Sequence, residues 1–209
     1  MQTTLSPSSI GLFLECPRCF WLQLHGTRRP SGPFPSLPSG VDRILKAHVD
    51  THRGQLPPEL AGQSGVLFPD LVRLATWRDN RKGLRYKDPS GAELMGALDD
   101  LFVTPEGRYA PIDFKTRGFP LKDDTTDHYQ HQMDIYSFLL DANSLPSAGF
   151  ALLVFYHPDK VISEGLLKFH IEVKKVPTSP ARGLQLFQQA LQCLADPEPP
   201  KTCPWCRLI

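Results

Sequence analysis

The sequence predicts an α/β fold in which helices flank a mixed central sheet. Apolar residues recur at helical spacing in several segments, whereas other segments are continuously apolar or alternate with a period of two. The expected order is helix, two antiparallel strands, helix, two strands and helix, which is typical of a mixed sheet rather than a sandwich or a bundle. A chain of 209 residues with 41% hydrophobic content can bury one core. We therefore expect residues 1–209 to form one domain.

Composition and charge exclude several classes of protein. Lys and Arg number 23 against 22 Asp and Glu, so the formal charge of +1 excludes a strongly basic, histone-like protein. No segment approaches the roughly 18 apolar residues of a membrane span, and the first residues lack the basic and apolar regions of a signal peptide. We expect a cytoplasmic protein without a membrane contact, which binds nucleic acid only through a local patch.

The first part of the chain predicts two helices joined by a loop. Ser8 or Ser9 can cap a short helix that ends near Pro17. Residues 27–40 contain too many prolines and glycines for a helix or a central strand, which indicates a connecting loop. Residues 41–53 then form the second helix.

The middle of the chain predicts a basic region followed by a hairpin. Residues 71–87 hold the densest group of basic side chains in the sequence. Residues 93–103 and 109–115 have strand character, and Pro105 and Gly107 between them are turn residues. These two strands should pair with each other.

The last third of the chain predicts a helix, two strands and a final helix. Residues 128–140 have helical apolar spacing, residues 149–156 are continuously apolar, and residues 167–173 alternate. Thr178 or Ser179 can begin the final helix. Its apolar stripe consists of Leu184, Phe187, Leu191 and Leu194.

The predicted hairpin contains the charged residues that point most specifically to a functional site. Asp113 and Lys115 are two residues apart on a strand, so both side chains leave the same face of the sheet. The register of the hairpin decides which acid joins them. If the turn is centred on Glu106, Asp99 lies opposite Asp113; if it is centred half a step earlier, Asp100 moves to that face. The residues alone leave this choice open.

Two carboxylates directly across a ladder repel each other, so a buried pair requires a proton or a cation between them. Mg²⁺ prefers such oxygen ligands and keeps waters for a substrate phosphate. Lys115 could then lower the pKa of a metal-bound water or stabilise negative charge that develops on phosphate. The alternative is a solvated hairpin face with a cross-strand ion pair, which is the usual explanation for charges on a hairpin.

Four of the five cysteines form two C-x-x-C pairs at opposite ends of the chain. Cys16 and Cys19 lie near the start, and Cys203 and Cys206 lie near the end. If the termini meet, the four thiolates can bind one zinc ion or one 4Fe–4S cluster, and the spacing does not distinguish these. A redox pair and simple buried thiols are the alternatives. Cys193 on the last helix is expected to pack in the core.

Several motifs, in this order along the chain, resemble those of the RecB-like branch of the PD-(D/E)XK nucleases. Gly96 to Asp99 resembles its GxxD motif, residues 113–115 resemble (D/E)xK, and Gln132 with Tyr136 resembles QxxxY. The N-terminal cysteine segment is also similar to that of CRISPR-associated and helicase-linked nucleases that bind an iron–sulfur cluster. The resemblance implies a restriction-endonuclease-like core.

The resemblance also implies roles for individual residues. It selects Asp99 rather than Asp100, because Gly96 stands three residues before it. The implied catalytic residues are Asp99, Asp113, Lys115, Gln132 and Tyr136.

The metal site that the resemblance implies uses Asp99, Asp113 and the backbone carbonyl of Phe114. It also includes a histidine on an early helix, for which His48 is the best match. His52 and Asp50 compete with His48 for that place.

The resemblance further implies that residues 1–26 and 197–209 form a cysteine-rich clasp around a 4Fe–4S cluster. The cysteines are split two and two here, whereas the familiar pattern is one and three, so Zn²⁺ stays an alternative. Arg18, Arg28 and Arg29 beside the clasp are candidates for contacts with DNA phosphates, although a solvated surface is the commoner role of any single arginine.

The function that follows is a DNA nuclease dependent on Mg²⁺ or Mn²⁺, with an exonuclease preferred to an endonuclease. Its expected setting is DNA repair, recombination or CRISPR-type DNA processing, and its expected partners are DNA and either a helicase or CRISPR adaptation proteins. The first alternative is a non-catalytic module that keeps the nuclease fold and binds nucleic acid or a helicase. The second is a redox protein that uses the C-x-x-C pairs.

Overall fold

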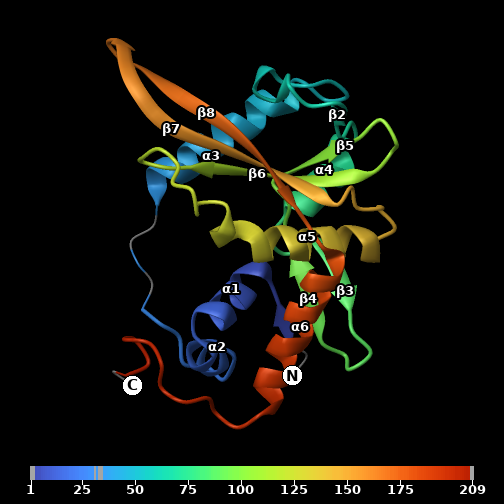
Figure 1. The fold of residues 1–209 in the computed structure, drawn as a ribbon, viewed down its shortest axis with the longest axis vertical. Helices are drawn as coiled ribbons and strands as arrows, with labels where there is room; N and C mark the ends of the chain where they lie inside the picture. Colours follow the sequence, from blue (N-terminus) through green and yellow to red (C-terminus); the bar gives the residue numbers. More distant parts are fainter. Residues whose placement is uncertain (1–2, 31, 33–34, 208–209) are drawn as a thin grey trace.

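The computed structural model describes residues 3–30, 32 and 35–207, and it arranges them as two β-sheets with helices between and around them (Figure 1). The predicted α/β fold with a mixed sheet and flanking helices is confirmed. The outermost residues of the predicted clasp, 1–2 and 208–209, lie outside the described residues.

The N-terminal segment contains β1 (Thr4–Leu5), α1 (Pro7–Glu15) and α2 (Pro17–Leu24). The cap of α1 is Ser6, not the predicted Ser8 or Ser9. The Ser6 hydroxyl accepts the backbone N–H of Ser9, and the Ser9 hydroxyl accepts the backbone N–H of Ser6, which together form a capping box. Helix α2 was not predicted. Pro17 does end α1, but it also stands at the start of α2, where a missing N–H costs nothing.

The loop predicted over residues 27–40 is too long, because α3 (Ser36–Asp50) begins before Gly40. Pro38 falls in the first turn of α3, where the backbone N–H has no intrahelical partner in any case. The predicted end at residue 53 is also wrong, since the helix ends at Asp50. The helix therefore presents one more turn to the sheet at its N-terminal end than the sequence pattern indicated.

Four short elements follow α3: η1 (Pro58–Leu60), β2 (Val66–Leu67), α4 (Leu71–Arg78) and β3 (Leu84–Lys87). Asp70 caps α4 by accepting the backbone N–H of Arg73. The predicted basic region is thus a capped helix followed by a strand at the edge of the smaller sheet.

The single strand predicted over residues 93–103 is two strands in two different sheets. β4 (Glu93–Gly96) pairs with β1 and β3, whereas β5 (Asp100–Val103) belongs to the larger sheet. A Cβ on Gly96 would lie 2.7 Å from Leu139 Cδ1 and 2.9 Å from Tyr136 Cε1, so only a glycine allows this close approach of the next helix. The chain crosses between the sheets directly after this glycine.

The predicted hairpin is confirmed as β5 paired with β6 (Tyr109–Thr116). Asp100 pairs with Ile112 and Val103 pairs with Tyr109, which corresponds to a turn centred on Glu106. Continuing this register by one residue puts Asp99 opposite Asp113. The structure therefore selects one of the two registers that the sequence left open.

Helix α5 (Gln130–Ala142), preceded by the short η2 (Asp127–Tyr129), corresponds to the helix predicted over residues 128–140. It lies between the two sheets and contacts β3, β4, β6 and β7 (Figure 1). Because it is covered on several sides, even polar positions such as Asp134 and Ser137 are buried. The helix thereby joins the two sheets through one apolar cluster.

The two strands predicted at 149–156 and 167–173 are longer than expected. β7 (Phe150–Ser163) and β8 (Leu166–Pro177) pair over their whole length and project beyond β6 as a two-stranded ribbon (Figure 1). The continuous apolar run ends near residue 157 because only that half of β7 is covered on both faces. The larger sheet has the order β2-β5-β6-β7-β8, with only β6 and β7 parallel.

The last helix, α6 (Pro180–Ala195), is capped by Ser179, one of the two predicted caps. Phe187 of the predicted stripe is fully buried, and Leu184, Leu191 and Leu194 pack on the same cluster. α6 packs on α5, and also contacts α1 and α2. No helix in the described ranges is long and apolar enough to cross a membrane.

Candidate active site and metal centre

The candidate active site is built on β6, where a charged pair interrupts an apolar strand. Asp113 is 2% exposed, and its Oδ2 atom lies 2.5 Å from Lys115 Nζ. Lys115 Nζ also donates to Gln132 Oε1 at 3.3 Å and lies 4.6 Å from the centroid of the Tyr129 ring. The alternation of the strand puts both charged groups on the face that α5 covers, as the sequence predicts.

Asp99 stands where the chain leaves the smaller sheet and enters β5. Its Oδ2 atom accepts the backbone N–H of Phe114 at 3.1 Å. The ladder between β5 and β6 ends at Asp100, so this carboxylate replaces the missing strand partner of Phe114. The carbonyl of a strand residue points to the same side as its N–H. The Phe114 carbonyl therefore points toward the edge where Asp99 lies, as a carbonyl ligand would require.

Two residues of α5 hold the acidic side chain of β6 in place. Gln132 Nε2 donates to Asp113 Oδ1 and to Tyr136 Oη, both at 3.0 Å. The Tyr136 hydroxyl donates to the Ala97 carbonyl at 2.7 Å, between Gly96 and Asp99. Burial raises the pKa of Tyr136 above its ordinary value, so the hydroxyl stays a donor. The structure thus brings both helix residues of the predicted motif to the hairpin.

The electrostatics of this site are those of two acids in a confined space. Burial, together with the negative charge of Asp99, raises the pKa of Asp113 to about 6, although the ammonium group of Lys115 opposes the shift. A second cation, Lys46 Nζ, lies 2.7 Å from Asp99 Oδ1. Burial by itself would lower the pKa of Lys46, but its contacts with Asp99 raise it. Two ammonium groups therefore balance two carboxylates.

The residue of α3 that faces Asp99 is Lys46, not the predicted His48. His48 Nε2 lies 3.2 Å from Glu59 Oε1, its ring stacks edge-on with His52, and its side chain is 43% exposed. Two residues along a helix differ by about 200° in direction, so Lys46 and His48 face opposite sides. Among the described residues, Asp99 belongs to no group of three His, Cys, Asp or Glu ligand atoms that lie within 4.8 Å of one another.

The competitors for the third-ligand position also point elsewhere. His52 Nδ1 lies 3.1 Å from the Thr51 hydroxyl. Asp50 accepts hydrogen bonds from Arg53 and from Arg78 Nη1, the latter at 2.9 Å. Although burial opposes it, these two guanidinium groups lower the pKa of Asp50.

Asp100, the acid next to Asp99, has a different role. Its side chain is fully buried, and it accepts hydrogen bonds from Arg53 at 2.5 and 2.7 Å and from Arg78 at 3.2 Å. Arg78 Nε also donates to the Asp99 backbone carbonyl at 2.7 Å. Asp100 is thus part of a buried ion-pair network that fixes the backbone around Asp99, rather than part of the candidate active site.

Sequence reasoning missed Lys46 and its partner Asp42, which lie 2.9 Å apart. The signal was available, because residues 42, 46, 49 and 50 recur at helical spacing and mark one face of α3. His48, which the family resemblance implies as a ligand, lies on the other face.

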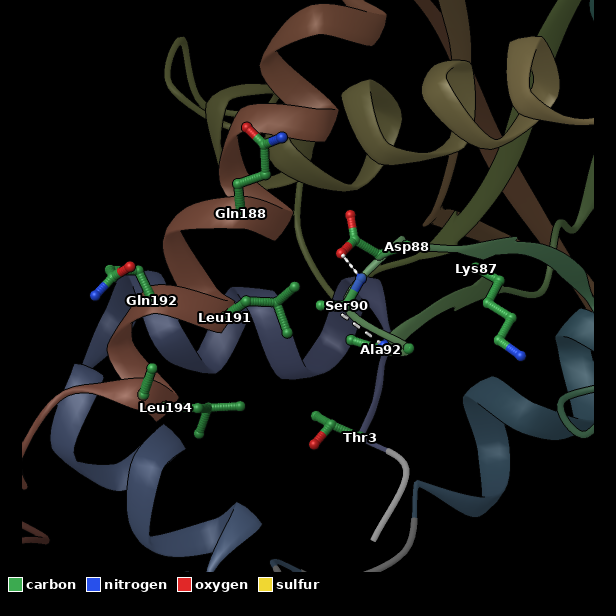
Figure 2. A pocket seen from close by; sticks show the side chains of 11 residues that line it. Thr3, Lys87, Asp88, Ser90, Ala92, Gln188, Leu191, Gln192 and Leu194 are labelled. Carbon is green, nitrogen blue, oxygen red and sulfur yellow. Dashed lines mark hydrogen bonds between the residues drawn. The ribbon is translucent and has the colours of Figure 1, made fainter.

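The candidate active site opens onto a shallow hollow rather than a deep cleft. A depression of about 260 Å³ is lined by Asp42, Ser39 and the stretch from Phe114 to Thr116. Figure 2 shows a larger cavity, of about 820 Å³, between α6 and the turn that joins β3 and β4. Its lining includes Thr3 and Lys87 but none of the predicted site residues. An extended substrate suits a shallow, open site better than a small molecule does.

The four cysteines of the predicted clasp meet at one point. Cys16 Sγ lies 3.8 Å from Cys206 Sγ, Cys19 Sγ lies 3.4 Å from Cys203 Sγ, and all four sulfurs lie within 4.8 Å of one another. The first pair occupies the N-terminal turn of α2. The second is held by the backbone N–H of Cys206, which donates to Cys203 Sγ and lowers the pKa of that thiol to about 6. The clasp is therefore a possible metal centre.

The spacing of these sulfurs tests which metal group fits. Four bonds of about 2.3 Å to a single tetrahedral ion place neighbouring sulfurs about 3.8 Å apart. The observed 3.4 to 3.8 Å separations match that value. A 4Fe–4S cluster puts four irons and four sulfides between its thiolates, which requires the thiolates to stand farther apart. These three contacts are therefore close to the spacing around a single tetrahedral ion, and all four sulfurs lie within 4.8 Å of one another.

The arginines predicted to contact DNA are largely engaged by the clasp itself. Arg18 donates to the Pro199 carbonyl and pairs with Glu198, while Arg29 donates to Cys203 Sγ at 3.4 Å. Arg28 is exposed. Cys193 packs at the edge of the main apolar cluster, as expected.

Sequence and structure comparisons relate the chain to known proteins. The family model of the PD-(D/E)XK nuclease superfamily matches residues 4–208. A solved structure described as "Crystal structure of SSO0001" is similar at 15% identity, with a TM-score of 0.47, over 92% of this chain and 77% of the other. No curated protein shows a significant match.

Proposed function

Because the chain belongs to the PD-(D/E)XK nuclease superfamily, we propose that it is a metal-dependent nuclease that hydrolyses phosphodiester bonds in DNA. The observation that carries the proposal is the buried Asp113, held by Gln132 and Lys115 and facing Asp99 across the hairpin. Burying Asp113 close to a second carboxylate costs stability even with Lys115 and Lys46 present, and the neighbouring Asp100 already anchors this corner of the fold.

In the proposed reaction, Asp99, Asp113 and the Phe114 carbonyl would hold a Mg²⁺ or Mn²⁺ ion. Oxygen donors at the end of a strand suit either ion, which would supply an activated water and neutralise charge on the phosphate. Lys115 Nζ, already in contact with Asp113, orients the attacking water and stabilises the charge that develops on the phosphate.

Gln132 and Tyr136 act as positioning residues in this proposal. Gln132 fixes Oδ1 of Asp113, while Oδ2, which contacts Lys115, would be the oxygen that the metal uses, and the Tyr136 hydroxyl holds Gln132 in place. Lys46 neutralises Asp99 until the ion is bound, and it then lies within reach of a substrate phosphate. For His48 to be the third ligand that the resemblance implies, its contact with Glu59 would have to break and α3 would have to turn.

The finer assignment rests on motif order. The GxxD, (D/E)xK and QxxxY motifs favour the RecB-like branch, and with it an exonuclease of DNA repair, recombination or CRISPR-type processing that acts beside a helicase or CRISPR adaptation proteins in the cytoplasm. The exposed Arg28 is the best remaining candidate of the three arginines for a phosphate contact.

The test is cleavage of labelled single- and double-stranded DNA with Mg²⁺ or Mn²⁺, with and without chelator. Asp113→Asn and Lys115→Met should each reduce the cleavage rate by about 10²-fold or more. Lys122→Met, at an exposed lysine of the following loop, is the matched control and should cleave as the unaltered protein does. Equal rates in all four proteins would refute the proposed site.

For the clasp, we propose a structural metal ion bound by Cys16, Cys19, Cys203 and Cys206. The sulfur spacing favours Zn²⁺ over the 4Fe–4S cluster. Protein purified without oxygen should be colourless and contain stoichiometric zinc. A brown protein with broad visible absorption and about four irons per chain would overturn the zinc assignment in favour of the cluster.

The second candidate function, a non-catalytic module that binds nucleic acid or a helicase, is favoured by one observation. Lys46 faces Asp99 in the place where a helical metal ligand was expected. A site neutralised by two lysines could bind a phosphate without cleaving it. In that case the unaltered protein would retain labelled DNA with Mn²⁺ present, and no product would form.

A further inference from the structure

A second group of potential metal ligands lies on the ribbon of β7 and β8, outside both sites described above. His157 pairs with His170 across the two strands, and Glu172 lies two residues farther along β8. Alternate residues of a strand share a face, so the three side chains project together. One ligand atom from each lies within 4.8 Å of the others.

His157 is the unusual member of this group. Its side chain is buried, and its Nε2 atom has no hydrogen-bond partner. Its Nδ1 atom lies 3.4 Å from the Pro158 carbonyl, which favours the tautomer that carries the proton on Nδ1. The lone pair of Nε2 then faces Glu172 Oε1 at 3.7 Å. The Nε2 lone pair is buried without a donor, and a cation between it and the half-buried carboxylate of Glu172 would satisfy both atoms.

The other two ligands are placed to complete a site. Lys174 Nζ lies 3.0 Å from Glu172 Oε2, which engages that oxygen and leaves Oε1 free. The rings of His157 and His170 have centroids 5.0 Å apart, and His170 is exposed, so its ring can turn without disturbing the core. Bonds of about 2.1 Å in a tetrahedral site separate ligand atoms by about 3.4 Å, close to the 3.7 Å observed between Nε2 and Oε1.

We propose that His157 Nε2, a ring nitrogen of His170 and Glu172 Oε1 bind a divalent transition-metal ion of the zinc class. Imidazole nitrogens select such ions over Mg²⁺. Three protein ligands leave one position open, as in metal sites that bind a water or an anionic oxygen. The proposal does not depend on the nuclease assignment.

The open coordination position of the proposed ion lies on the same face of the sheet as the candidate active site. Lys115, Phe155 and Glu172 occupy neighbouring strands in one row, so their side chains share a face of the sheet. Strands about 4.8 Å apart place the Cα atoms of Lys115 and Glu172 about 10 Å from each other. An ion on the ribbon would therefore lie on the same face as the candidate active site, near enough to hold a second anionic group of an extended substrate.

The test is equilibrium dialysis of the full chain against micromolar Zn²⁺, followed by elemental analysis of the bound metal. We expect His170→Asn and Glu172→Gln each to bind one zinc ion fewer per chain than the unaltered protein, with a loss of affinity of tenfold or more. Zinc bound by the cysteine clasp is the same in the variants and in the unaltered protein, so it does not affect the difference between them. His128→Asn, at an exposed histidine in η2, is the matched control and should bind as much zinc as the unaltered protein.

A large excess of Mg²⁺ should not displace the additional ion, and circular dichroism should show both variants folded. If the unaltered protein, His170→Asn and Glu172→Gln bind the same amount of zinc with the same affinity, the proposal is wrong. The contact between His157 and Glu172 is then a polar contact that needs no metal ion.

Discussion

The cysteine clasp and the carboxylate site both join distant segments of the chain, but they differ in whether a cation of the protein already neutralises their acidic groups. The four thiols surround a point that one cation can fill. The backbone N–H groups of Cys203 and Cys206 already donate hydrogen bonds to two of the sulfurs. In the carboxylate site, two ammonium groups already contact the acids, and Asp113 still has a raised pKa. In the function proposed above, the clasp gains stability from a metal, whereas the carboxylate site gives up stability for catalysis.

The largest effect expected from this contrast is at the clasp. Cys206→Ser should lower the free energy of unfolding by several kcal/mol, because the binding energy of a structural metal is folding energy. Cys193→Ser, at a thiol outside the clasp, is the matched control and should cost about 1 kcal/mol or less. Urea unfolding measures both. Equal losses in the two variants would mean that the clasp has no stabilising metal.

The next effect separates two neighbouring acids. Asp100→Asn should destabilise the protein by about 3 to 5 kcal/mol, because two guanidinium groups lose the buried one of their two carboxylate partners. Asp99→Asn should cost only about 1 kcal/mol, the value of its hydrogen bond to Phe114, but should abolish cleavage. Urea unfolding and DNA cleavage together check the pair. A stable Asp100→Asn variant would contradict the division of roles.

Acid should weaken metal binding at the carboxylate site. Since the pKa of Asp113 is raised to about 6, the carboxyl is protonated below that pH, and a metal must displace the proton. The affinity for Mn²⁺ should fall about tenfold for each pH unit below 6 and stay nearly constant from pH 7 to 8. Isothermal titration calorimetry measures this profile. An affinity that is flat between pH 5 and 7 would exclude Asp113 as a ligand.

The smallest effect concerns Lys46. Lys46→His should bind Mn²⁺ about fivefold more tightly, a change of about 1 kcal/mol, because it removes a competing cation and adds a ligand nitrogen. Lys46→Met removes the charge without adding a ligand, and it should show a smaller gain. If Lys46→His binds Mn²⁺ no better than Lys46→Met does, α3 is not oriented to supply a third ligand.

Local patterns predicted the elements but not all of their ends. The final helix was predicted with one of its two candidate caps, since both its serine cap and its apolar stripe are short-range signals. Helix α3 was predicted to start too late, because the pattern of prolines in residues 27–40 masked a start at Ser36. The strand over residues 93–103 was predicted as one piece, since its apolar alternation does not reveal that the chain changes sheets after Gly96.

Of the candidate active site, the sequence indicated the pair on β6 through its local spacing, and the resemblance to the QxxxY motif indicated the two residues on α5. The sequence did not reveal Lys46, since the side chain that a helix turns toward a hairpin depends on how the two elements dock. The residues alone left Asp99 and Asp100 undecided and only the resemblance selected Asp99, because the register of the hairpin is a tertiary property.

By itself, the sequence determined the fold class, the two C-x-x-C pairs and the acid–lysine strand, because each follows from periodicity or from spacing within a few residues. Only the tertiary structure decided that Asp99 faces the site while Asp100 faces two arginines, that Lys46 rather than His48 approaches the acids, and that His157 meets His170 and Glu172. These outcomes depend on strand register and helix rotation, which are fixed by long-range packing.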